Sequence, residues 1–174
     1  MRRLILFRHA KAVPHGAAPD IDRALTLEGR DMASAMGEWL NDQGIVPDLV
    51  VCSPSVRTRE SWHFASLAFD PPPPVIYVDP IYDAPPETLL AVLHAVENDI
   101  ATLMLVGHNP GIEALTAVLA ESGEPDVVER YERKFPPAAV AVLDFEDVPW
   151  AAVEEKSAWF AMFETPKNLG FKDE

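Results

Sequence analysis

Histidine and arginine residues recur where predicted strands end. Arg8 and His9 come directly after the apolar run at residues 4–7, Arg57 lies a few residues beyond a later strand, and His108 follows another. An imidazole can act as a nucleophile or base, and a guanidinium binds phosphate oxygens in a bidentate manner. Two histidines and two arginines brought together could therefore bind a phosphate, attack it and stabilise its transferring state.

Apolar runs and amphipathic stretches alternate along the chain and would position these groups. Strands are predicted over residues 3–8, 49–52, 75–78, 102–106, 138–143 and 158–163. Helices are predicted over residues 26–41, 53–69, 86–98 and 112–120. This alternation predicts an α/β fold, a three-layer α/β/α sandwich with a mostly parallel central sheet. In such a sheet the carboxyl ends of the strands meet at one edge, where ligands bind.

Local signals set the boundaries of these elements. Thr26 is expected to cap the first helix, and Ser53 the second, with Pro54 at its first helical position. Residues 121–137 are expected to be irregular because charges and three prolines interrupt any periodic pattern. The whole chain, residues 1–174, is expected to form a single domain that ends in a polar tail from about residue 165.

Composition narrows the possible functions. The net charge of −14 argues against general binding to nucleic acid or to an anionic membrane. Cys52 is the one cysteine, so the chain can form neither an internal disulfide nor a thiolate metal cluster, and a reducing cytoplasm fits best. The first apolar run is too short for a signal peptide or a membrane span. The sequence contains neither the GxGxxG dinucleotide motif nor the GxxxxGK[ST] nucleotide loop.

Taken together, the motifs resemble those of the histidine phosphatase superfamily, which has the phosphoglycerate-mutase-like fold. Residues 8–10 (Arg-His-Ala) are similar to its Arg-His-Gly motif, with Ala10 in place of glycine in the turn after the histidine. Residues 53–57 match its Ser-Pro-x-x-Arg, and residues 106–111 resemble the turn that carries its second histidine. Residues 23–29 are similar to the Arg-x-Leu-Thr-x-x-Gly that opens the first helix in SixA-type phosphohistidine phosphatases.

The resemblance implies a role for each of these residues. It makes His9 the nucleophile, which becomes a phosphohistidine that water then hydrolyses. Arg8, Arg57 and His108 would hold the non-bridging oxygens, so that neither a metal nor another cofactor is required. Two further residues, Arg23 and Asn109, are candidates for substrate binding. The resemblance also implies that the strands adjoin in the order 3-2-4-1, which places the strands ending at His9 and His108 side by side.

The general acid is the missing piece of this interpretation. Asp83 follows the third strand and could protonate a leaving group, but an aspartate before Ala84-Pro85-Pro86 could equally form a turn. Phosphohistidine releases imidazole, a good leaving group that depends little on an acid. A phosphohistidine borne by another protein is therefore the favoured substrate.

Other functions stay open on sequence alone. They are a phosphomonoesterase acting on a small phosphorylated metabolite, and a phosphate-binding module without catalysis. A metal-dependent hydrolase could use His9, His108 and Asp83, but the sequence lacks the HxH and HExxH spacings typical of such sites.

Overall fold

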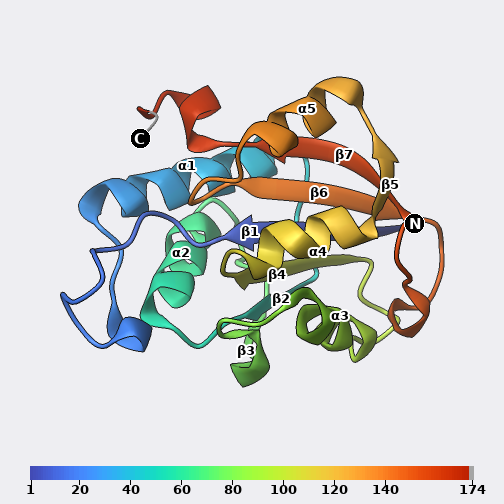
Figure 1. The fold of residues 1–174 in the computed structure, drawn as a ribbon, viewed down its shortest axis with the longest axis horizontal. Coiled ribbons are helices and arrows are strands. Elements are labelled where there is room, and N and C mark those ends of the chain that lie inside the picture. The colour runs from blue at the N-terminus through green and yellow to red at the C-terminus, as the bar shows by residue number, and fades with distance from the viewer. Residues whose placement is uncertain (173–174) are drawn as a thin grey trace.

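A seven-stranded sheet runs through the computed structural model, which describes residues 1–172. Its strands lie in the order β3-β2-β4-β1-β6-β7-β5 (Figure 1). They are β1 (Arg2–Arg8), β2 (Leu49–Cys52), β3 (Val75–Tyr77), β4 (Thr102–Gly107), β5 (Ala120–Gly123), β6 (Val140–Phe145) and β7 (Ala158–Glu164). Strand β6 is antiparallel to its neighbours β1 and β7, and the other neighbouring pairs are parallel. The predicted order 3-2-4-1 is confirmed.

Helices cover both faces of this sheet, as the three-layer prediction requires (Figure 1). The helices are α1 (Leu27–Asp42), α2 (Val56–Ser66), α3 (Pro86–His94), α4 (Gly111–Leu119) and α5 (Pro125–Arg133). Strand β1 is buried on both sides: Ile5 and Phe7 pack with α1 and α2, whereas Leu4 and Leu6 pack with α3 and α4. The alternation of side chains along a strand thus divides the core into two layers.

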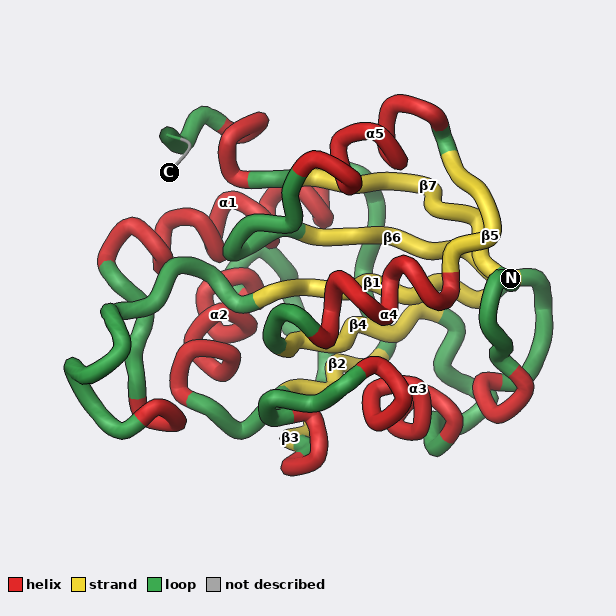
Figure 2. The backbone as a smooth tube through the Cα atoms, in the orientation of Figure 1, coloured by secondary structure: helices red, strands yellow, loops and turns green. Residues whose placement is uncertain are grey.

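Strands β1 and β4 form the centre of the sheet and carry the two predicted site histidines. They pair in parallel register with Arg8 opposite Gly107, and the His9 amide donates to the Gly107 carbonyl at 3.1 Å. The helices that follow them, α1 and α4, pack on opposite faces. This arrangement opens a crevice at the strand ends, and Figure 2 shows the long loop between β1 and α1 at that end of the sheet.

The N-caps of the first two helices differ in how well the sequence predicts them. Thr26 caps α1, accepting a hydrogen bond from the Gly29 amide at 3.0 Å, as expected. The prediction for the second helix is wrong, because α2 begins at Val56 with Ser55 as its cap. The Ser53 hydroxyl instead pairs with His108. Two serines flank Pro54, and only the tertiary contact selects which of them caps the helix.

The prediction that residues 121–137 are irregular is also wrong, because this stretch contains most of β5 and all of α5. Pro125 occupies the first turn of α5, and Val127 is its buried residue. Tyr131 packs its ring against Phe163 with the ring centroids 6.0 Å apart. Val127 and Tyr131 lie four residues apart on one face of α5, which is a helical spacing. The helix is only nine residues long, begins at a proline and is rich in charge, so its sequence resembles a loop.

Residues 166–171, within the stretch described as a polar tail, contact the folded core. Residues Pro166–Leu169 form a 3₁₀ turn, and Leu169 and Phe171 pack at the edge of the core layer that holds α1. Across residues 1–172, none of the helices combines the length and the apolar character needed to cross a bilayer.

Candidate active site

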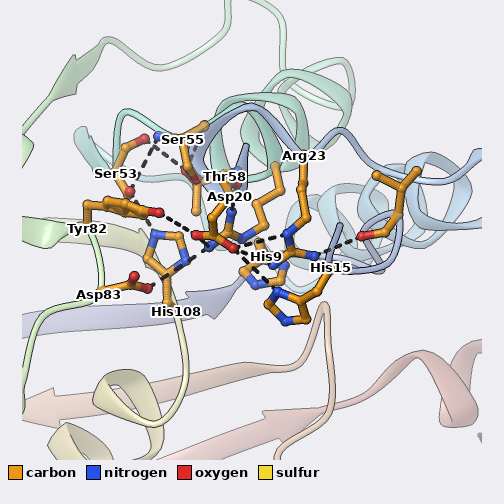
Figure 3. A network of polar contacts seen from close by, with 12 residues as sticks. His9, His15, Asp20, Arg23, Ser53, Ser55, Thr58, Tyr82, Asp83 and His108 are labelled. Atoms are coloured by element: carbon orange, nitrogen blue, oxygen red, sulfur yellow. Dashed lines mark hydrogen bonds and ion pairs between the residues drawn. The ribbon is translucent and has the colours of Figure 1, made fainter. Parts of the chain in front are cut away.

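A cleft of about 370 Å³ opens where β1 and β4 end (Figure 3). Its lining comprises Arg8, His9, Ala12, His15, Asp20, Arg23, Arg57, Asp83, His108 and Asn109. The seven residues singled out from the sequence are all among them. Residues from four separate parts of the chain therefore meet at the edge of the sheet that the strand order predicts.

His9 lies at the floor of the cleft in a form suited to nucleophilic attack. Its Nδ1 lies 2.7 Å from the Ala10 carbonyl oxygen, which can only accept a hydrogen bond. The proton must therefore sit on Nδ1, leaving a lone pair on Nε2. Burial, with smaller contributions from His108, Arg57 and Arg8, lowers the pKa of His9 to about 3. The imidazole is consequently neutral at physiological pH.

His108 stands next to His9, with the two ring centroids 5.5 Å apart. Its Nε2 shares a hydrogen bond of 2.8 Å with the Ser53 hydroxyl, and its Nδ1 is buried without a hydrogen-bond partner in the described structure. The ring of Tyr82 packs edge-on against it at 5.4 Å. Burial first, and Arg57 second, lower the pKa of His108 to about 4. In the absence of substrate, His108 is therefore also neutral.

Two arginines flank the histidines and are held by backbone oxygens. Arg57, in the first turn of α2, is almost fully buried and donates from Nη1 to the Asp20 carbonyl at 2.7 Å. Arg8 donates from Nη1 to the Phe135 carbonyl, also at 2.7 Å. The backbone carbonyls take one terminal nitrogen of each planar fork. Nη2 of Arg57 is also paired with the Asp20 carboxylate, so a phosphate oxygen that binds there must share or displace that contact.

Asp20 is the residue that sequence reasoning missed. Its carboxylate lies 3.2 Å from Arg57 Nη2 and 3.1 Å from Arg23, and the Tyr82 hydroxyl donates to it (Figure 3). The Tyr82 hydroxyl, with smaller contributions from the two arginines, holds the pKa of the Asp20 carboxyl well below its ordinary range. Asp20 is therefore a fixed anion among the cationic groups of the cleft.

Neither Asp20 nor Tyr82 carried a recognisable signal in the sequence. Asp20 starts the 3₁₀ turn Asp20–Asp22 within the polar loop after β1, and Tyr82 follows β3 in another loop. The one available hint was the position of Asp20, three residues before Arg23, because two oppositely charged residues at that spacing in a helical turn can pair.

Asp83 and Asn109 line the cleft without standing at its centre. The Asp83 side chain is 63% exposed and lies 4.0 Å from Arg57 Nη2. Asn109 is engaged internally: its Oδ1 accepts from the Glu113 amide at 3.1 Å, and its Nδ2 donates to the Phe135 carbonyl at 3.3 Å. Asn109 thus ties the start of α4 to the same carbonyl that holds Arg8. That pattern suits a positioning residue.

The described residues offer no evident metal-binding group. Between residues 1 and 172, no three His, Cys, Asp or Glu side chains cluster in a way that could hold a metal ion.

Comparison with known sequences points to one family. A family model described as histidine phosphatase superfamily (branch 1) matches residues 4–79, which include the segments around His9 and Arg57. An uncharacterized protein of Mycobacterium tuberculosis is 37% identical over 163 residues, covering 92% of this chain and 99% of that protein. The likeness therefore extends through the His108 turn and beyond.

Solved structures agree with the sequence comparison. Two are described as "putative phosphohistidine phosphatase SixA". The one from Nakamurella multipartitia superposes with a TM-score of 0.81 and 31% identity, covering 95% of this chain and 96% of that one. The other, from Agrobacterium tumefaciens, has a TM-score of 0.72 and 33% identity, with coverage of 83% and 92%.

Proposed function

The chain belongs to the histidine phosphatase superfamily and is a phosphatase, and from that premise we propose that it hydrolyses phosphohistidine on another protein through an intermediate on His9. The observation that carries the proposal is the neutral, oriented imidazole of His9 beside Arg8, Arg57 and His108. The likeness to proteins described as phosphohistidine phosphatases supports the same choice of substrate.

In the first step the phosphoryl group binds between the arginines. Guanidinium nitrogens of Arg8 and Arg57, the latter shared with Asp20, and a ring nitrogen of His108 hold its non-bridging oxygens. The lone pair on His9 Nε2 attacks phosphorus, a P–N bond to His9 forms, and the P–N bond to the substrate imidazole breaks. The departing imidazole nitrogen takes a proton from solvent.

In the second step water attacks the phosphorus of phosphorylated His9. The P–N bond breaks, inorganic phosphate leaves, and the water proton is lost to solvent or phosphate, which restores neutral His9. Guanidinium groups that are already in place before the reaction stabilise the negative charge of the phosphoryl group in the transition state. The proposed chemistry therefore uses side chains of this chain together with water.

The carboxylates of the cleft support phosphohistidine over a phosphomonoester. An alkoxide leaving group requires a proton from a positioned acid, whereas imidazole does not. The cleft lining contains two carboxylates, Asp20 and Asp83. Asp20 stays ionised because its pKa is held well below the ordinary range, and Asp83 is largely exposed. Neither carboxyl group is enclosed in apolar surroundings.

A substrate panel tests the proposal. Equal phosphate concentrations are supplied as a phosphohistidine protein, a sugar phosphate and a phosphoserine peptide, with and without EDTA. We expect chelator-resistant release of phosphate, fastest from the phosphohistidine protein. A sugar phosphate cleaved orders of magnitude faster would replace the substrate class with a small phosphomonoester. Phosphate binding without any turnover would indicate a non-catalytic binding module.

A further inference from the structure

Four of the five lysines of this chain line a single hollow. The lysines are at positions 11, 134, 156, 167 and 172, and all except Lys156 border a cavity of about 230 Å³. Its remaining lining is apolar: Met32, Pro136, Pro137 and Pro166. We name this cavity, with its four lysines and four apolar residues, the lysine pocket. Such a concentration of positive charge is unexpected in a chain whose net charge is −14.

Two chain segments connect the lysine pocket to the catalytic cleft. In the first, Lys11 lines the pocket and its neighbour Ala12 lines the cleft. In the second, Pro136 lines the pocket and follows Phe135, whose carbonyl holds Arg8. The two segments meet near the nucleophile, where the Ala138 amide donates to the His9 carbonyl at 3.0 Å. A ligand in the pocket would therefore contact the same segments that position Arg8 and His9.

The segments that carry the lysines are fixed by the fold. The Lys11 carbonyl accepts from the Thr26 amide at 3.0 Å and packs so closely on α1 that a Cβ at Gly29 would lie 2.1 Å from it. The turn that bears Lys167 is closed by the Phe171 amide, which donates to the Pro166 carbonyl at 3.1 Å. Lys11 also lies 3.8 Å from Glu28, which offsets part of the local positive charge.

We propose that the lysine pocket docks an acidic surface segment of the protein substrate, an inference that rests on the proposed phosphohistidine function. Two features point to such an occupant. First, a chain with this net charge repels acidic proteins overall, so a local basic hollow creates the attraction that directs them to one place. Second, the apolar floor of one methionine and three prolines suits the aliphatic parts of a peptide better than a small ion.

Replacing lysines of the pocket by glutamate tests whether the pocket binds the protein substrate without taking part in catalysis. In Lys134→Glu/Lys167→Glu both changes fall in the pocket, whereas Lys156→Glu is the matched control outside it, where Nζ donates to the Ala117 carbonyl. Steady-state kinetics are measured with an acidic phosphohistidine protein and with para-nitrophenyl phosphate. The single variant Lys167→Glu, which changes net charge by the same amount as the control, is measured in parallel.

For the double variant we expect KM on the protein substrate to rise about tenfold at low salt, with kcat and para-nitrophenyl phosphate turnover unchanged. Lys167→Glu should raise KM about threefold and Lys156→Glu hardly at all, and added salt should shrink the differences. Docking is overturned if the pocket variants match Lys156→Glu, or if the small substrate is affected equally. A wild-type enzyme that hydrolyses para-nitrophenyl phosphate but no phosphohistidine protein would instead overturn the proposed function, and the docking inference with it.

Discussion

The carboxylate of Asp20 lies 3.2 Å from Nη2 of Arg57, while the Asp20 carbonyl accepts from Nη1 of the same guanidinium at 2.7 Å. A loop residue thus holds both outer nitrogens of an arginine that is almost fully buried at the centre of the site. A phosphoryl group that binds Arg57 must share it with this carboxylate or displace it. The loop after β1 and the substrate therefore compete for one cation.

Asp20→Asn should strengthen the binding of inorganic phosphate. The amide retains the size of the side chain and can still accept a hydrogen bond, but it removes a negative charge from beside Arg57 and Arg23. Because the carboxylate is partly exposed, we expect a gain of at most about 1 kcal/mol, or roughly fivefold in the inhibition constant of phosphate. Competitive inhibition at neutral pH measures it, and an inhibition constant that is unchanged or weaker would show that Asp20 does not oppose the ligand.

The histidine pKa values predict how the stability of the fold depends on pH. His9 and His108 have folded pKa values of about 3 and about 4, below the ordinary 6.5 that an unfolded chain restores. Below pH 6.5 the unfolded chain therefore binds protons that the folded chain does not, so stability falls with falling pH down to the folded values. Each histidine contributes up to about 1.4 kcal/mol per pH unit in that window.

Denaturant titrations of the wild type and of His9→Asn at pH 6.5, 5.5 and 4.5 measure this dependence. We expect a steep loss of unfolding free energy in the wild type and a shallower one in the variant, which has one buried imidazole fewer. Equal slopes would mean that His9 titrates alike in the folded and unfolded states. A neutral His9 in the folded enzyme would then have no support.

The placement of the histidines and arginines could be predicted from the sequence. A strand buried in a parallel sheet is recognisable as an apolar run, and the carboxyl ends of such strands meet at one edge of the sheet, where ligands bind. His9 and His108 follow such runs directly, and Arg57 lies in the first turn of the next helix. Asp20 and Tyr82 were not predictable, since they reach the site from loops whose path depends on tertiary contacts. Helix α5 was missed because it is short, begins at a proline and lies in a charge-rich stretch that resembles a loop.

Asp83→Asn tests whether the exposed carboxylate acts as an acid. If Asp83 protonates alkoxide leaving groups, the variant should slow hydrolysis of an alkyl phosphomonoester by tenfold or more, about 1.4 kcal/mol of barrier. Hydrolysis of phosphohistidine should change by only a few-fold, because imidazole leaves without that help. Parallel kcat/KM measurements with both substrates supply the comparison, and equal losses on the two would assign Asp83 to binding, through its proximity to Arg57.

The most direct test of the account is to trap the phosphorylated enzyme. Wild-type protein and His9→Ala are mixed with a ³²P-labelled substrate and quenched within milliseconds, and the labelled peptide is identified. The account predicts that the wild type carries acid-labile, base-stable phosphate on the peptide containing His9. It also predicts that His9→Ala carries none and loses turnover by several orders of magnitude, because its nucleophile is gone. Normal turnover by His9→Ala, or label on another residue of the wild type, would contradict it.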